Sequence, residues 1–137
     1  MKTKTQILLE TFKYYEEDPT RRGIKKGSSS CVYKTQEGNK CALGLRINED
    51  RLKAYGLTLE NLNTHGNVVE LTSFLKNQNL SIDNILFDDY IGHDHDFWLD
   101  VQKFHDGSSL WDNGSEEEKE VNRTITKGEL LTKYKNL

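Results

Sequence analysis

Three side chains in this sequence are of the types that thiol chemistry needs. Cys41 could act as a nucleophile, His105 as its base, and Asp106 as the carboxylate that orients the base. Two considerations argue against that use. His105 and Asp106 are neighbours at the end of a predicted helix, where adjacent side chains diverge. A cysteine is also among the residues most often buried as a small core side chain. We therefore favour structural roles for the three residues and keep catalysis as an alternative.

The other cysteine of the chain is Cys31, and nine residues separate it from Cys41. Two hairpin registers around residues 36–39 are open. If Gly38 adopts the left-handed conformation of a three-residue turn, the cysteines are diagonal neighbours about 6–8 Å apart, too far for a disulfide. In a four-residue turn they face opposite sides. A zinc knuckle needs a shorter cysteine spacing. We predict reduced thiols, no metal and no cofactor; the three-residue turn gives one buried hairpin face, formed by Cys31, Tyr33, Cys41 and Leu43.

The elements that position these residues are mainly helices. Apolar periodicity and capping residues predict helices near 3–18, 48–56, 67–77, 80–87 and 94–106, and a capping box begins another at 115. Gly128 is expected to interrupt that last segment. In the helix at 94–106, Phe97, Val101 and Phe104 should face the core. The predicted fold class is α+β, mostly helical, with a single domain over residues 1–137 in which one β-hairpin at about 31–47 packs against several short helices.

The charge distribution is lopsided, although the net charge is only −3. Residues 83–120 contain twelve acidic and two basic side chains, a net charge of −10. Residues 1–53 contain twelve basic and seven acidic side chains, a net charge of +5. Such a polarised field can steer a charged partner. The acidic run therefore predicts a surface for a basic protein, with Asp88, Asp89, Glu116 and Glu117 as its contacts, and it disfavours nucleic acid.

A basic loop offers a second candidate site. Arg21, Arg22, Lys25 and Lys26 lie in a stretch with no acidic residue, followed by three serines at 28–30. These side chains could bind a small anionic ligand. No aromatic residues are interleaved with them, and the loop has no glycine-rich phosphate-binding motif, so nucleotide or single-strand binding has no specific support.

Hydropathy sets the expected location of the chain. No stretch approaches the roughly 20 apolar residues of a membrane span, and the apolar stretch near the start is three residues long, too short for a signal peptide. We therefore expect a cytoplasmic protein without a membrane partner. The oligomeric state is left open.

Two short motifs carry a resemblance. C-x-Y at Cys31–Tyr33 and G-x-x-C-A-x-G at Gly38–Gly44 resemble a small uncharacterised family of proteins from bacteria and their phages. That family has L-Q-x-x-H-D at the end of a downstream helix, and "VQKFHD" at 101–106 is the counterpart here, with Val101 in place of leucine. The similarity covers roughly residues 20–110, and the chain lacks the second cysteine and the proline-containing stretch expected after C-A-x-G. The resemblance implies a phage or mobile-element setting and brings no known activity.

These observations together favour a small binding or regulatory protein over an enzyme. In a phage setting, it would inhibit a host protein by occupying it through the acidic surface. The alternatives are an enzyme with a Cys41 nucleophile and a His105 base, and a protein that sequesters a small anionic ligand at the basic loop.

Overall fold

The computed structural model describes residues 1–25 and 31–135, and the helices in them surround one hydrophobic core. The elements are α1 (Lys4–Glu17), η1 (Pro19–Arg21), η2 (Gly44–Arg46), α2 (Glu49–Ala54), α3 (Leu59–Leu62), α4 (Val68–Asn77), η3 (Ile82–Ile85), η4 (Asp88–Tyr90), α5 (His95–Asp106), α6 (Ser108–Trp111) and α7 (Glu116–Lys133). The α+β prediction was wrong, because these two ranges contain isolated bridges but no β-strand.

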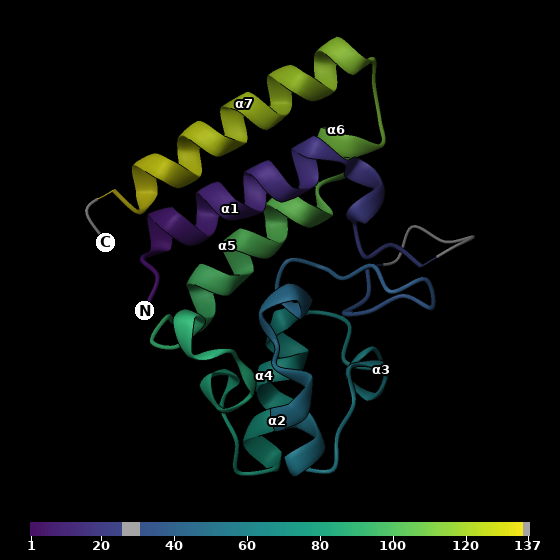
Figure 1. The fold of residues 1–137 in the computed structure, drawn as a ribbon. Coiled ribbons are helices and arrows are strands. Elements are labelled where there is room, and N and C mark those ends of the chain that lie inside the picture. The colour runs from purple at the N-terminus through teal and green to yellow at the C-terminus, as the bar shows by residue number, and fades with distance from the viewer. Residues whose placement is uncertain (26–30, 136–137) are drawn as a thin grey trace.

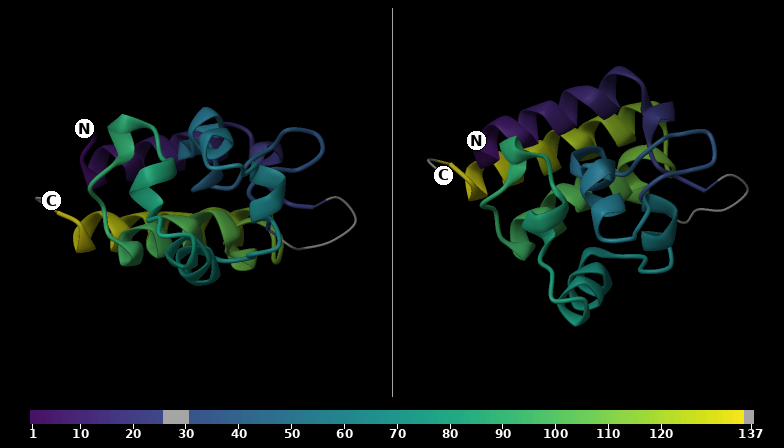
Figure 2. Two further views of the ribbon diagram at one scale, coloured as in Figure 1. Left: turned by 90° about the horizontal axis from the view of Figure 1, so that it is seen from below. Right: turned by 60° about the horizontal axis from the view of Figure 1, so that its bottom comes forward.

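Three long helices form one side of the molecule. α1, α5 and α7 pack against one another in all three pairings, and Figure 1 shows them as parallel rods above the shorter helices α2, α3 and α4. The right-hand view of Figure 2 shows the same division from a further direction. Phe97, Val101 and Phe104 of α5 are completely buried, as the periodicity predicted. α5 is therefore the central element, with α1 and α7 on one side and α4 on the other.

The predicted hairpin at 31–47 was wrong beyond its turn. Gly38 has a positive φ of 91°, and the amide of Thr35 donates to the carbonyl of Asn39 at 2.8 Å, which are the features expected of the three-residue turn. No ladder follows, because the chain coils into η2 at Gly44. A Cβ on Gly44 would lie 2.3 Å from the carbonyl oxygen of Tyr33, so glycine is required where these two segments meet.

Consecutive burial explains why this segment is not a strand. Cys41, Ala42 and Leu43 are all buried, whereas a strand on a protein surface alternates between two faces. Arg46 is buried as well, and it donates to the carbonyl of Ala42 at 2.9 Å and to the hydroxyl of Thr11 at 2.8 Å. The turn of η2 points this guanidinium at α1. The segment is thus a loop whose second part, residues 41–47, packs into the core.

Helix starts agree well with the capping residues in the sequence. The side chains of Thr3, Asn48, Asp94 and Ser115 all accept hydrogen bonds from backbone amides in the first turns of α1, α2, α5 and α7. Two predictions near the C-terminal half differ. The helix expected at 80–87 is the short 3₁₀ helix η3, and α7 continues through Gly128 without interruption. In the described ranges, no helix combines the length and the apolar character that crossing a membrane requires.

Candidate functional site

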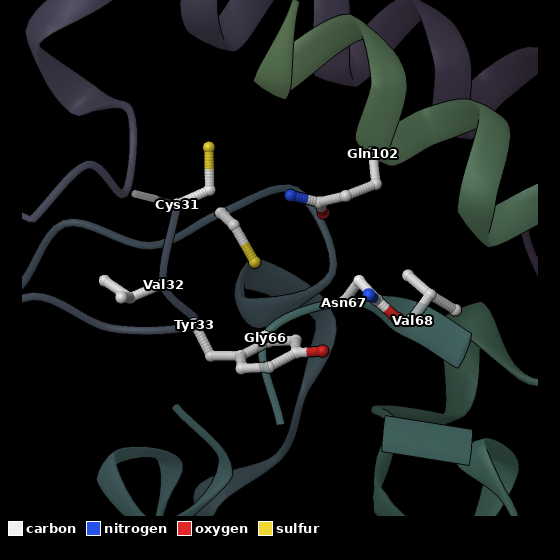
Figure 3. Close-up of a pocket in the computed structure, with 8 residues that line it drawn as sticks. Cys31, Val32, Tyr33, Gly66, Asn67, Val68 and Gln102 are labelled. Atoms are coloured by element: carbon white, nitrogen blue, oxygen red, sulfur yellow. The ribbon is translucent and has the colours of Figure 1, made fainter. Parts of the chain in front are cut away.

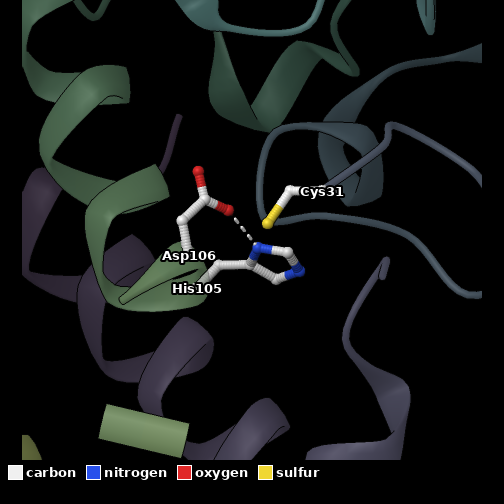
Figure 4. A group of neighbouring side chains, drawn as sticks. All are labelled: Cys31, His105 and Asp106. Carbon is white, nitrogen blue, oxygen red and sulfur yellow. Dashed lines mark hydrogen bonds and ion pairs between the residues drawn. The ribbon is translucent and has the colours of Figure 1, made fainter. Parts of the chain in front are cut away.

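The side chain of His105 is at the centre of a buried polar cluster at the C-terminal end of α5. Its Nε2 accepts a hydrogen bond from the backbone amide of Gly23 at 2.9 Å. Its Nδ1 lies 2.5 Å from a carboxylate oxygen of Asp106, which also accepts from Gln102 at 2.8 Å. The thiol sulfur of Cys31 lies within 4.8 Å of this carboxylate and of the His105 ring nitrogen. Figure 4 shows how Cys31, His105 and Asp106 converge. We call these five residues the His105 cluster.

This arrangement fixes the tautomer of His105. A backbone amide can only donate, so Nε2 must be the unprotonated nitrogen, and the neutral ring carries its proton on Nδ1. The Nδ1–H group then donates to Asp106. Both nitrogens are occupied and the side chain has no exposed surface. His105 therefore has no free nitrogen with which to act as a general base.

Two neighbouring residues join the cluster to the N-terminal part of the chain. A Cβ on Gly23 would lie 2.5 Å from the amide nitrogen of Cys41, so only glycine allows this backbone to approach both the loop and His105. The guanidinium of Arg22 donates from Nε to the carbonyl of His105 at 2.9 Å and pairs with Asp112 at 3.1 Å. The first contact satisfies one of the terminal carbonyls of α5. The cluster thus ties α5 to the segment that follows α1.

The pKa directions in the cluster favour an unreactive state. Burial lowers the pKa of His105 more than Asp106 raises it, which keeps the ring neutral. Burial is the largest single influence on Asp106 and would raise its pKa, but the contacts with His105 and Gln102 and the nearby Cys31 thiol together outweigh burial, and the pKa is lowered. Burial and the nearby Asp106 carboxylate both raise the pKa of Cys31. A nucleophilic thiol needs the opposite shift.

The ligand atoms of Cys31, His105 and Asp106 lie within 4.8 Å of one another, which is close enough to consider a metal ion. The tautomer argues against it. Coordination through Nδ1 would move the ring proton to Nε2, where it would meet the amide proton of Gly23. Metal-bound histidines normally donate their other ring N–H to an acceptor. The cluster is therefore better suited to structural hydrogen bonding than to metal binding.

Cys41, the predicted nucleophile, is outside this cluster. Its side chain is buried, its Sγ accepts from the amide of Gly44 at 3.3 Å, and burial raises its pKa to about 12. Together with Cys31 and Tyr33 it lines a cavity of about 10 Å³, which Figure 3 shows beside Gln102. That volume holds about one water molecule. Both cysteines are free, as predicted. Tyr33, Cys41 and Leu43 are buried, but Cys31 is only half-buried, so the predicted buried hairpin face of four residues was wrong.

The basic loop does not present its charges together. Arg21 pairs with Glu17 at 3.3 Å and donates to the carbonyl of Tyr14, and Arg22 is buried in the contacts described above. Lys25 is exposed, and Lys26 lies outside the described residues, as do the serines at 28–30. The two arginines are thus committed to the fold, and of the candidates in the described part of this loop only Lys25 is exposed.

The acidic run is divided between the two ends of α1. The carbonyl of Asp89 accepts from the amide of Lys2 at 2.7 Å, which places η4 beside the start of α1. Near the end of α1, Glu16 pairs with Lys127 of α7 at 2.8 Å, and the first turns of α7 lie beyond that point. A helix of this length separates the two groups by about 20 Å. Asp88 and Asp89 therefore do not share one surface with Glu116 and Glu117.

The outward face of α7 combines acidic and apolar side chains. Val121 and Ile125 are 52% and 53% exposed, although most large hydrophobic side chains in the described ranges are buried. Together with Glu117, Glu120 and Thr124 they line a shallow groove on this helix. Neither Glu117 nor Glu120 forms an ion pair within the described part of the chain. This apolar strip with unpaired carboxylates is the clearest interaction surface that the described residues present.

Sequence reasoning missed several residues that matter at both places. Cys31, not Cys41, accompanies His105, and Gly23 and Gln102 complete the cluster. The glycine within "RRGIKK" was the one available signal for a close backbone approach. Val121 and Ile125 were also missed, although their spacing by four residues on a helix places them on one face. No protein-family model, curated protein or solved structure matches the chain.

Proposed function

We propose that this is a small binding protein that occupies a protein partner with a basic surface through the outward face of α7. The observation that carries the proposal is the pair of exposed apolar side chains, Val121 and Ile125, beside the carboxylates of Glu117 and Glu120, which no cation in the described ranges pairs. Apolar contacts supply affinity, whereas charges at the rim govern encounter rate and partner choice. In the phage or mobile-element setting that the motif resemblance implies, the partner would be a host protein.

The positions of the basic side chains on α7 favour a positively charged partner. Lys127 and Arg123 of α7 both contact Glu16 of α1, at 2.8 and 3.7 Å. Lys133 pairs with Asp100 of α5 at 2.7 Å. These cations are paired with acidic side chains of α1 and α5, whereas Glu117 and Glu120 on the outward face have no such partner in the described ranges. An acidic rim repels phosphates, which favours a basic protein over nucleic acid or an anionic lipid surface.

The alternatives receive less support. An enzyme with a Cys41 nucleophile and a His105 base needs those two side chains together, whereas Cys31 occupies that place and both thiol pKa values are raised. A protein that sequesters anions needs accessible cations, and Arg22 is buried. The α7 face requires no rearrangement to bind a partner, which is why we prefer it.

Selection from a library of randomised, displayed polypeptides tests the proposal while the partner is still unidentified. The wild-type protein is the bait, and the library is first depleted on the double variant Glu117→Lys/Glu120→Lys. We expect enriched sequences with a net positive charge that bind this variant at least about tenfold more weakly than the wild type. They should also bind less tightly as the salt concentration rises, since exposed charges are screened over about 8–10 Å.

The matched control reverses the charge of two acidic residues at the other end of α1. Asp88→Lys/Asp89→Lys changes the net charge by the same amount, so a selected partner should bind it within about threefold of the wild type. The proposal fails if the library yields no enriched binder, if enriched sequences are acidic, or if both double variants weaken binding equally. Circular dichroism of each variant shows whether the helices are retained.

A further inference from the structure

We propose that the partner binds as a basic amphipathic helix lying antiparallel along α7, with its closest approach at Gly128. This inference rests on the proposed function and specifies the shape and direction of the partner. The candidates elsewhere in the described residues are weaker, because the His105 cluster is internally satisfied and the basic loop is committed to the fold. The outward face of α7 has the periodicity, the shape and the charge that a second helix would match.

The apolar strip has the spacing of a helix-packing seam. Val121, Ile125, Gly128 and Thr132 follow one another at intervals of four, three and four residues, and none of them is buried. Residues at these intervals form one stripe along a helix, here about 16 Å long. A partner helix that packs on such a stripe places its own apolar side chains at the same intervals. A flat or irregular partner would not use this repeat.

Gly128 is the least expected residue in that stripe. Glycine in a helix interior is about 1 kcal/mol less favourable than alanine. A Cβ added at Gly128 would meet no heavy atom within 4 Å, so packing inside this chain does not require glycine there. Glycine in a packing face lets another helix approach more closely than the usual 8–10 Å between axes. A partner side chain seated over Gly128 would explain why the position lacks a Cβ.

Charge argues against a second copy of this chain as the occupant. If two α7 helices pack antiparallel so that Val121 of one faces Gly128 of the other, Glu120 faces Glu129 at both ends of the contact. Both glutamates are exposed. Like charges placed opposite each other destabilise such a pair, whereas lysine or arginine at those positions would stabilise it. The occupant is therefore a helix of opposite charge.

The uneven distribution of acids gives the direction. Glu116, Glu117, Glu118 and Glu120 are all in the first five residues of α7. The basic side chains of the partner should lie over this end. Cations are most favourable near the C-terminus of the helix that carries them, because of the helix dipole. A partner with its cations in its C-terminal half thus places that end over the start of α7, which is the antiparallel arrangement.

The probe is a designed peptide of about 18 residues, with leucines at intervals of four, three and four and lysines flanking them in its C-terminal half. Its affinity is measured by fluorescence anisotropy. Gly128→Ala should raise the melting temperature by roughly 2–5 °C and still weaken binding by about threefold or more. Gly128→Gln, which is longer, should weaken it by about tenfold or more. Ser73→Ala on α4 is the control: it also improves helix propensity but should leave affinity unchanged.

Cross-linking determines in which direction the peptide lies along α7. A photoreactive group at the C-terminus of the peptide should attach to residues 116–121, and one at its N-terminus to residues 128–133. The reverse pattern overturns the antiparallel arrangement. If Glu117→Lys/Glu120→Lys weakens binding but Gly128→Gln does not, the proposed function stands, but the proposal that a partner helix packs over Gly128 is wrong. If neither variant weakens binding, or if the peptide does not bind, the proposal of a partner helix along α7 is refuted. The library selection then tests the proposed function separately.

Discussion

Lowering the pH should destabilise the protein through His105. In the unfolded chain this side chain has an ordinary pKa of about 6.5. In the folded protein burial lowers the pKa, and the amide of Gly23 occupies the nitrogen that would accept the proton. Above pH 6.5 the ring is neutral in both states and has no effect on pH dependence. Below it, only the unfolded chain takes up a proton, so the free energy of unfolding falls.

The size of the effect follows from linkage. One such group lowers the free energy of unfolding by at most about 1.2 kcal/mol between about pH 7 and pH 5.5, at about 1.36 kcal/mol per pKa unit. The groups that face the ring are Asp106, Arg22, Cys31 and Tyr15. None of them has an ordinary pKa within this interval. The loss in this window is therefore attributable to histidine.

Urea unfolding at the two pH values measures this loss. Glutamine at position 105 keeps a donor and an acceptor but does not titrate. Between the two pH values, the free energy of unfolding of His105→Gln should therefore fall by about 1 kcal/mol less than that of the wild type. His93→Gln is the matched control, because burial lowers the pKa of His93 too, but that side chain is more exposed and its share should be smaller. The reasoning is refuted if His105→Gln retains the full pH dependence, or if the wild type is more stable at the lower pH.

Three further predictions concern buried or close contacts. Cys41→Ser should lower the free energy of unfolding by about 1–3 kcal/mol in chemical denaturation, and the native thiol should react slowly with a labelling reagent at pH 7, since burial raises its pKa to about 12. Gly44→Ala should lower the free energy of unfolding by about 2–4 kcal/mol, because the added Cβ would lie 2.3 Å from the carbonyl oxygen of Tyr33. Gly66→Ala is the control: its Cβ would meet nothing within 4 Å, so it should change the free energy of unfolding by less than about 0.5 kcal/mol. Protein purified without chelator should contain less than stoichiometric zinc, and zinc that disappears in His105→Ala would contradict the assigned tautomer.

Local sequence signals predicted the helices because helix capping and periodicity act over a few residues. Asp94 accepts from the amide of Phe97 at 2.8 Å, and Phe97, Val101 and Phe104 face the core. The hairpin failed because burial in this segment does not follow the alternation of apolar residues at 43, 45 and 47: Ala42, Gly44 and Arg46 are buried as well. Arg46 is buried because it contacts Thr11 of α1. That contact spans 35 positions of the chain, and no local pattern indicates it.

The candidate site was only partly predictable for the same reason. His105 and Asp106 were identified from their types, but the expectation that they diverge was wrong, since they hydrogen-bond at the end of α5. The contact between His105 and Gly23 joins residues 82 positions apart. The acidic run was correctly seen as a feature of the sequence. Its division between the two ends of α1 depends on how α7 packs back along α1, which charge counts do not contain.

Carboxyl footprinting tests the central claim, that the outward face of α7 binds a basic partner, most directly. Exposed carboxylates are converted to amides with a carbodiimide and glycine ethyl ester, with and without a saturating amount of a basic peptide enriched in the library selection. Each site is quantified by mass spectrometry. We predict that Glu117 and Glu120 lose most of their labelling when the peptide is present, while Asp88 and Asp89 keep theirs. Unchanged labelling on α7, or protection of Asp88 and Asp89 instead, would contradict the claim.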